Sequence, residues 1–254
     1  MRDAPRTRRT DELSVDGARL PPDVTRLLEH GELRIEGRLI DASNATLYCQ
    51  VRLGGENAHA VYKPIAGERP LWDFPDGTLA ARELAAYLVS EALGWSIVPP
   101  TVSRAGPLGD GMLQLWIDVD ETVDVTRLVR GRDPQLRRMA LFDAVVNNAD
   151  RKGGHLLPTS AGHIFGIDHG VCFHREDKLR TVLWQWRGRS LSAEDTDALT
   201  RLREHLDAAL GERLSDVLSG HEVAATGARV ERLLTTRRFP LPSGEWPSIP
   251  WPPF

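Results

Sequence analysis

The chain has 254 residues, 41% of them hydrophobic and 27% charged, which is typical of a globular protein with a full hydrophobic core. Its formal net charge of −4 provides no domain-wide basic field, so nucleic acid is not expected as a partner. No apolar stretch approaches the ~18 residues that cross a bilayer, so stable membrane insertion is not expected. The first ten residues contain four arginines without a following apolar segment, which argues against a secretory signal and favours a cytoplasmic location. Cys49 and Cys172 lie far apart in apolar runs and are expected to be buried free thiols rather than a disulfide.

The first half of the chain predicts a lobe built mainly from strands. Residues 1–18 are polar and arginine-rich and are expected to form a disordered tail. Residues 19–119 begin with a short helical pattern and continue with three alternating patterns that predict an antiparallel meander. A longer helix is expected between Thr78, its predicted N-cap, and Gly94. The strands are expected at residues 33–40, 46–53, 58–63 and 112–119.

Residues 120–238 predict a second lobe that is mainly helical. Its first 14 residues, 120–133, are polar and are expected to be a connection without regular structure. Apolar runs near Leu157 and Ile164 predict a short hairpin between the helices. Helices are expected to begin at Asp133-Pro134, at Ser192 with an apolar stripe through Leu210, and at Ser219, where Glu222 completes a capping-box match.

The last segment, residues 239–254, is rich in proline and cannot form a helix. We expect it to lie across the domain surface with Trp246 and Trp251 buried. A ligand for proline-recognising domains is the alternative.

Two glycine-bearing turns each contain an acidic residue and directly follow an apolar run. The first, residues 148–155, contains Asp150, and the second, residues 166–170, contains Asp168. In phosphoryl transfer one carboxylate takes the proton of the attacking hydroxyl, and another holds the magnesium that neutralises the phosphates. An aspartate in a turn is usually only a turn former, so neither turn is decisive alone. Together they favour a phosphoryl-transfer site.

Lys63 stands at the end of a predicted core strand, from which its charge can project into a cleft and meet phosphate. An edge lysine that only reaches water is the alternative. Glu83, in the following helix, can pair with Lys63 and fix its position. Glu91, two turns later, is the rival, although position 83 fits the inner face of the lobe better.

The turn at residues 41–45, between the predicted strands 33–40 and 46–53, contains small polar residues. Ser43 and Asn44 in this turn would let backbone amides approach a phosphate, and a plain hairpin turn is equally compatible with them. The sequence contains neither GxxxxGK[ST] nor GxGxxG, which removes the basis for a P-loop or a Rossmann fold.

The order of these motifs resembles the protein-kinase-like superfamily, most closely its phosphatidylinositol 3-/4-kinase branch and a related actinobacterial family. In that branch one loop reads Asp-Arg-His-x-x-Asn and another reads Ile-Asp-Phe-Gly. Asp150-Arg151 matches the first loop, and Ile167-Asp168 with Gly170 matches the second. The stretch 142–150 also resembles HipA-type bacterial kinases. The resemblance covers roughly residues 35 to 190.

The resemblance implies an α+β, two-lobed protein-kinase-like fold, with a small antiparallel-sheet N-lobe and a mainly helical C-lobe. It implies ATP and Mg²⁺, or Mn²⁺, as cofactors. By position, Lys63 would contact the α- or β-phosphate with Glu83 as its anchor, and Asp168 would ligate the metal. Asp150 would accept or orient the acceptor hydroxyl. The main chain of Gln114, Leu115 and Trp116 would meet adenine, and Ser43 and Asn44 would cover the phosphates.

The sequence departs from the family pattern at three positions. The metal ligand expected five residues after Asp150 is His155, and imidazole suits zinc, copper or iron better than magnesium. His155 therefore contacts phosphate, favours manganese, or marks lost activity. Lys152 replaces a histidine and either screens the γ-phosphate charge beside Asp150, as a catalytic residue, or is a solvated turn residue. His169 replaces the aromatic residue of the second loop.

The sequence therefore predicts a kinase that transfers the γ-phosphate of ATP to a hydroxyl of a small-molecule, lipid or protein acceptor. A non-lipid acceptor is preferred, because no basic amphipathic helix is present. The basic segment 171–190 either meets an anionic acceptor or forms a solvated face over buried tryptophans. An ATP-binding pseudokinase that acts as a sensor, and an AMP transferase, are the alternatives.

Overall fold

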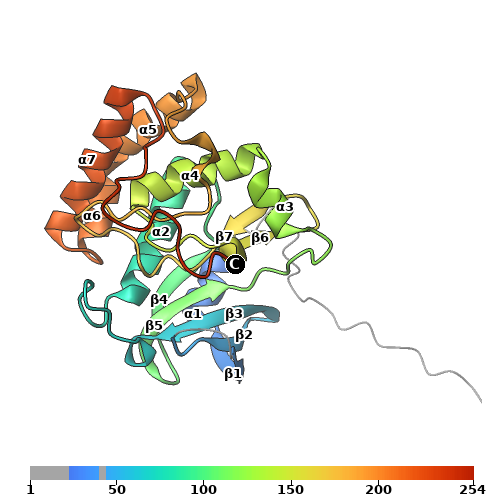
Figure 1. Ribbon diagram of the computed structural model, residues 1–254. Coiled ribbons are helices and arrows are strands. Elements are labelled where there is room, and N and C mark those ends of the chain that lie inside the picture. Colours follow the sequence, from blue (N-terminus) through green and yellow to red (C-terminus); the bar gives the residue numbers. More distant parts are fainter. Residues whose placement is uncertain (1–22, 40–43) are drawn as a thin grey trace, which may run out of the picture.

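Five antiparallel strands form the sheet of the smaller lobe in the computed structural model, which describes residues 23–39 and 44–254 (Figure 1). The strand order is β1-β2-β3-β5-β4, which confirms the predicted meander of the first three strands. The strand expected at 112–119 is shifted, because Gly109 pairs with Gly106 in a tight hairpin and the strand ends at Leu115. The tail predicted at residues 1–18 lies outside the described residues. The strands are β1 (Glu32–Arg38), β2 (Leu47–Leu53), β3 (Glu56–Pro64), β4 (Thr101–Gly106) and β5 (Gly109–Leu115).

Alternation along β3 gives the sheet one face for a core and one face for a cleft. Tyr62 is fully buried on the core face, so its neighbour Lys63 points to the other face. Helix α1 (Val24–His30) covers the core face with the fully buried Leu27 and Leu28. The position of Lys63 in the strand therefore determines that its ammonium group faces the second lobe.

Helix α2 (Leu79–Leu93) ends as predicted at Gly94, which adopts a left-handed conformation with φ of 67°. Thr78 occupies the N-cap position of α2, as predicted. The Thr78 side chain makes no capping bond. Instead, the Glu68 carboxylate accepts hydrogen bonds from the amides of Leu79 and Ala80, at 3.1 and 2.8 Å. A longer acidic side chain from the preceding loop therefore satisfies these amides in place of the Thr78 side chain.

The second lobe is mainly helical and contains the predicted hairpin. The Asp133 cap and the Ser219–Glu222 capping box are both present. The connection expected at 120–133 without regular structure contains a short helix. The helix from Ser192 ends at Leu206 and does not reach Leu210, because the backbone at Ala208 is not helical. The helices are α3 (Val125–Arg130), α4 (Pro134–Val146), α5 (Ala193–Leu206), α6 (Ala209–Ser215) and α7 (Gly220–Thr236), and the hairpin strands are β6 (Leu156–Pro158) and β7 (Ile164–Gly166).

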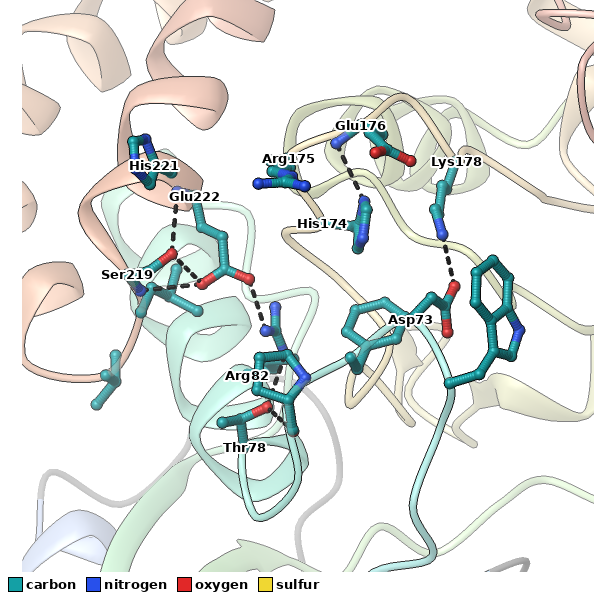
Figure 2. A pocket seen from close by; sticks show the side chains of 15 residues that line it. Asp73, Thr78, Arg82, His174, Arg175, Glu176, Lys178, Ser219, His221 and Glu222 are labelled. Carbon is teal, nitrogen blue, oxygen red and sulfur yellow. Dashed lines mark hydrogen bonds and ion pairs between the residues drawn. The ribbon is translucent and has the colours of Figure 1, made fainter.

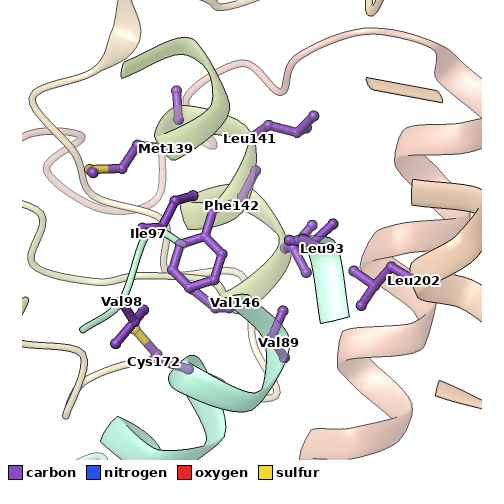
Figure 3. Packing of buried hydrophobic residues seen from close by; sticks show 14 of the residues in the cluster. Val89, Leu93, Ile97, Val98, Met139, Leu141, Phe142, Val146, Cys172 and Leu202 are labelled. Carbon is purple, nitrogen blue, oxygen red and sulfur yellow. The ribbon is translucent and has the colours of Figure 1, made fainter. Parts of the chain in front are cut away.

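The core of the second lobe also contains one face of α2. Val89 and Leu93 of α2 pack in one cluster with Phe142 and Val146 of α4, and all four are at least 95% buried (Figure 3). Leu202 of α5 closes the same cluster. Helix α2 is therefore a rigid connection between the lobes, and it sets where Glu83 stands relative to α4 and the loop that follows it. The α+β, two-lobed architecture is confirmed.

The segment after Phe239 lies across the second lobe as predicted, but its tryptophans do not form a buried anchor. Trp251 is 85% exposed and Trp246 is half-buried, so the expected burial of both is wrong. Backbone hydrogen bonds hold the segment instead, for example from the Thr181 amide to Ser248 O at 3.0 Å. Both cysteines are free and buried, as predicted. Within the described ranges, none of the helices combines the length and apolar character that a membrane span requires.

Candidate active site

One cavity of about 210 Å³ between the lobes brings together five of the residues predicted from the sequence. It lies below the cleft face of the sheet, beside the first turn of α2, and reaches the two acidic turns of the second lobe. We call residues 148–155 the Asp150 loop and residues 166–170 the Asp168 loop. The cavity is lined by Asn44, Lys63, Glu83, Asp150 and Asp168, together with Pro64, Glu68, Arg69, Leu71, Leu79, Ala80, Gly170 and Val171.

Lys63 lies between two carboxylates from different elements. Its Nζ is 2.6 Å from Glu83 Oε1 and 2.8 Å from Asp168 Oδ1, so the predicted pairing with Glu83 is present. Glu91 is exposed on another face of α2 and is not a rival. Burial alone would lower the pKa of Lys63, but Asp168 and Glu83 outweigh it and hold the pKa above its usual value. Lys63 is therefore a permanent cation at the roof of the cavity.

The Asp168 loop is held in a strained conformation. Asp168 has a φ of 65°, in the left-handed region that few non-glycine residues adopt. The next amide, of His169, donates to Glu83 Oε2 at 2.9 Å, so Glu83 holds both Lys63 and this loop. The Lys63 ammonium holds the pKa of the Asp168 carboxyl well below its usual range, although burial opposes this. Asp168 therefore remains a carboxylate, with its side chain 52% exposed toward the cavity.

A buried ion pair that the sequence did not reveal joins the two loops. Asp143 in α4 and Arg151 are both fully buried, with Arg151 Nη2 2.9 Å from Asp143 Oδ1. Arg151 also donates to Ile167 O at 3.0 Å and lies 2.6 Å from His169 Nε2. Asn148 donates to Asp143 Oδ1 and accepts from the Asp150 amide. The sequence feature that could have indicated this ion pair is Asp143, an acidic residue inside the apolar run of α4.

Asp150 and Lys152 form a second and more open pair. Lys152 Nζ is 2.9 Å from Asp150 Oδ2, and the side chains are 24% and 30% exposed, respectively. Burial raises the pKa of the Asp150 carboxyl above its usual value of 3.8, and Lys152 offsets this only in part. A carboxylate with a raised pKa is a better proton acceptor than an ordinary aspartate.

His155 lies beside Asp168, with Nε2 3.3 Å from Asp168 Oδ2. Burial lowers the pKa of His155 to about 4, so the ring is neutral at pH 7. The Lys152 amide points at His155 Nδ1 from 3.5 Å, which assigns the proton to Nε2 and directs it at Asp168. In this tautomer His155 orients the Asp168 carboxylate and has no lone pair free for a metal ion.

The residues expected to meet adenine lie at the end of β5, outside the 210 Å³ cavity. The Leu115 amide donates to Pro100 O at 2.9 Å, and the Trp116 amide to His59 O at 3.0 Å, so neither is a free donor for a base. Gln114 is buried and donates to Thr101 Oγ1 at 2.8 Å. Within the described ranges, no hydrogen bond engages the next amide, that of Ile117.

Aromatic side chains continue the cleft face beyond Lys63, and the sequence had singled out Trp116 among them, but not Tyr48 or His59. Val61, two residues before Lys63, and its cross-strand partner Tyr48 share that face. The Tyr48 ring stacks on His59 at 5.0 Å between centroids and meets Trp116 edge-on at 4.9 Å. We call these rings the Tyr48–Trp116 platform; planar aromatic side chains of this kind can pack against a planar base.

Of the two residues expected to cover the phosphates, the structure places one. Asn44 lines the cavity, and its Oδ1 accepts a hydrogen bond from the Arg69 amide at 2.9 Å. Ser43 lies outside the described residues.

The residues of the cavity fit a metal ion that arrives with a nucleotide. Across residues 23–39 and 44–254, no three His, Cys, Asp or Glu side chains are grouped to enclose a metal ion. Nucleotide-site magnesium needs only one or two carboxylates, with phosphate oxygens completing its shell. Asp168, permanently ionised and half-exposed toward the cavity, provides such a carboxylate.

A larger cavity of about 630 Å³ lies apart from these residues, between the start of α2, residues 174–178 and the start of α7 (Figure 2). Its buried charges are paired: Arg82 donates to Glu222 Oε1 at 2.6 Å, and Lys178 to Asp73 Oδ2 at 2.6 Å. The Lys178–Asp73 pair, together with a hydrogen bond from Arg82 to Cys172 O at 2.8 Å, fastens the basic segment 171–190 to its surroundings, and Trp184 and Trp186 are buried beneath it. The cavity does not include Lys63, Asp150 or Asp168.

Two solved structures share the two-lobed fold. The structure of hydra Fam20 with sugar superposes with a TM-score of 0.57 at 14% identity, covering 88% of this chain and 91% of that one. The Helicobacter pylori proinflammatory kinase CtkA superposes with a TM-score of 0.50 at 12% identity, covering 84% and 94%. At such identities the similarity establishes the fold alone, and it confirms the protein-kinase-like fold predicted from the sequence.

Sequence comparison identifies two relatives, and no protein-family model matches the chain. Phosphatidylinositol 4-kinase gamma 4 of Oryza sativa subsp. japonica is 27% identical in an alignment of 168 positions that covers 52% of this chain and 29% of that protein. Protein Rv2133c of Mycobacterium tuberculosis is 43% identical in an alignment of 270 positions that covers 92% of this chain and 97% of that protein. The chain therefore belongs to the same family as Rv2133c, with a two-lobed protein-kinase-like fold.

Proposed function

We propose that this protein is an ATP-dependent phosphotransferase that moves the γ-phosphate of ATP to a hydroxyl group of an acceptor. One observation carries the proposal: Lys63, anchored by Glu83, shares a cavity with a permanently ionised Asp168 and with Asp150. The partial match to a phosphatidylinositol 4-kinase supports placing it in the phosphatidylinositol 3-/4-kinase-like branch.

The residues divide the chemistry between the two lobes. Lys63 would hold the α- or β-phosphate, and Asp168 would hold Mg²⁺ or Mn²⁺. The metal, when bound, supplies neutralisation of the phosphate charge. Asp150, with its raised pKa, would accept the proton of the acceptor hydroxyl, and Lys152 beside it would meet charge that develops on the transferred phosphoryl group. Adenine would lie against the Tyr48–Trp116 platform, with the Ile117 amide as its donor.

A non-lipid acceptor fits the segment 171–190 better than a lipid head group. Its two tryptophans are buried, and its buried lysine, Lys178, is already paired with Asp73. The segment therefore offers a solvated face over a packed core rather than a concentrated basic surface for an anionic membrane.

A second candidate is an ATP-binding sensor without turnover. The observation that favours it is His155, which stands where a metal ligand is expected but directs a proton at Asp168. AMP transfer, through a reversed nucleotide, is the third candidate.

The proposal is tested with ATP labelled at the γ- or the α-phosphate. We expect γ-label to leave ATP at a rate that falls by a factor of about 10² to 10⁴ in Asp150→Ala, because a positioned general base contributes that much. Glu83→Gln should also lose activity, whereas Glu91→Gln, on an exposed position of the same helix, should not. Consumption of γ-label that survives Asp150→Ala would contradict the assignment. Label from the α-phosphate on a product would establish AMP transfer, and ATP binding without turnover would establish a sensor.

A further inference from the structure

The segment 246–254, which we call the C-terminal strap, crosses the segment after the Asp168 loop and runs to the Asp150 loop (Figure 1). Ser248 O accepts two hydrogen bonds, from the Thr181 amide at 3.0 Å and from Trp184 Nε1 at 2.8 Å. Arg180 Nε donates to Pro247 O at 3.0 Å. The strap therefore follows residues 180–184, which themselves pair with Arg151 of the Asp150 loop.

The half-buried Trp246 ring adds a contact with Lys178 at the start of the strap. The Lys178 ammonium lies 4.7 Å from the Trp246 ring centroid and 4.8 Å from that of Trp72, which belongs to the loop before α2. The strap is thus attached to both lobes.

The other end of the strap packs directly against Gly153. The Gly153 amide donates to Pro253 O at 2.8 Å, and the Phe254 ring covers the Gly153 Cα so closely that any Cβ there would overlap the ring. Gly153 does not have a positive φ, so alanine fits its backbone, and the three atoms nearest to an added Cβ all belong to Phe254. A Cβ on the next residue, Gly154, meets no atom within 4 Å.

The turn that the strap holds lies between the two candidate site residues Lys152 and His155. The strap does not fill the cavity, because Asp150 still lines it with a side chain that is 30% exposed. The strap therefore fixes the Asp150 loop without covering the Asp150 carboxylate, as expected of a positioning element and not of an inhibitory segment.

We propose that the C-terminal strap is a positioning element of the active site, in which Pro253 and Phe254 fix the Asp150 loop in its working conformation. The proposal rests on the proposed function and deepens it. Phe254 is a positioning residue, since it acts through Gly153 and touches no reacting atom. A displacement of a catalytic group by about 1 Å can lower a rate on the order of 100-fold, so loss of the strap contact should affect turnover rather than nucleotide binding.

The test compares Gly153→Ala, Phe254→Ala and their double variant with Gly154→Ala as the matched control. We expect kcat to fall at least about tenfold in both single variants, while KM for ATP and the thermal stabilisation by Mg-ATP stay within about twofold of wild type. The double variant should fall no further than either single one, because all three lose the same contact. Phe254→Tyr, which keeps the ring, and Gly154→Ala should behave as wild type.

Hydrogen exchange at the Gly153 amide provides a readout that needs no chemistry. We expect protection in wild type and Gly154→Ala, and its loss in Phe254→Ala. Equal exchange of the Gly153 amide in wild type, Gly154→Ala and Phe254→Ala would overturn the proposal. A kcat that is unchanged or raised in Phe254→Ala would also overturn it. Wild-type protein that transfers no phosphate, but shows the expected difference in exchange, would overturn the proposed function and leave the strap's hold on the loop established.

Discussion

Two lysine–aspartate pairs border the same cavity and differ in what surrounds them. Lys63 lies 2.8 Å from Asp168 and is also held by Glu83, and the attraction keeps the Asp168 pKa below its usual range. Lys152 lies at a similar 2.9 Å from Asp150, yet the pKa of Asp150 is raised. The distances are alike, so burial and the number of partners decide the protonation behaviour of each carboxylate.

The difference separates two tasks. A carboxylate whose pKa is depressed stays ionised under all ordinary conditions, as a metal-holding group requires. A carboxylate with a raised pKa exchanges protons more readily, as an acceptor of the hydroxyl proton requires. The comparison supports the proposed roles, metal binding for Asp168 and proton transfer for Asp150, and each role can be tested one residue at a time.

The largest effect is expected from Asp168→Asn. Loss of the permanent carboxylate should remove metal-dependent ATP binding and lower phosphate transfer by a factor on the order of 10³ or more. Thermal stabilisation by Mg-ATP, about 2.7 kcal/mol at 100 times Kd in wild type, should vanish. Asp177→Asn, an exposed aspartate outside the cavity, is the control. Undiminished stabilisation in Asp168→Asn would show that the metal is held elsewhere.

Removal of the buried Asp143–Arg151 ion pair, which joins the Asp150 and Asp168 loops, should lower the stability of the protein. Asp143→Ala leaves Arg151 fully buried without its carboxylate, so we expect the free energy of unfolding to fall by about 3 to 5 kcal/mol. Asp207→Ala removes an exposed partner of Arg203 and should cost less than about 0.5 kcal/mol. Urea unfolding measures both, and equal midpoints would contradict a structural role for the buried pair.

The Lys152–Asp150 pair is tested through the pH dependence of kcat/KM. Activity needs ionised Asp150, so it should fall as the pH decreases through the Asp150 pKa. Lys152 lowers that pKa, and Lys152→Ala should therefore move the acid limb of the profile to higher pH. An acid limb that stays in place would mean that Asp150 is not the group that titrates.

The smallest effect is expected from His155→Asn. His155 is neutral and directs its proton at Asp168, so its loss should lower magnesium-dependent activity by less than about tenfold. The pKa of about 4 lies below the ordinary 6.5, so unfolded chains take up this proton first and stability falls as pH decreases between those values. His155→Asn should weaken that dependence. Higher magnesium-dependent activity in the variant would identify His155 as a degraded metal ligand.

The sequence predicted those structural features that depend on interactions between residues close together in the chain. The meander, the Gly94 end of α2 and the Ser219–Glu222 capping box all follow from residues a few positions apart, and all are present. The Lys63–Glu83 pair was also predictable, because strand alternation and helix position place both side chains on the cleft.

Features that depend on distant residues were not predictable in this way. Glu68 reaches over a loop to cap α2, and the exposed Trp251 belongs to a segment held by its backbone. Asp143 lies inside an apolar run, and its burial there is explained by its ion pair with Arg151, which belongs to the following loop. No spacing rule encodes these contacts, because the intervening chain sets their geometry.

The most direct test is an experimental structure with a non-hydrolysable ATP analogue and Mg²⁺. We expect that Lys63 and the Asp168-bound metal contact the phosphates, that the adenine lies against the Tyr48–Trp116 platform, and that the γ-phosphorus is the phosphorus nearest to Asp150. A nucleotide in the reverse direction, with the α-phosphate nearest to Asp150, or one bound outside this cavity would contradict it.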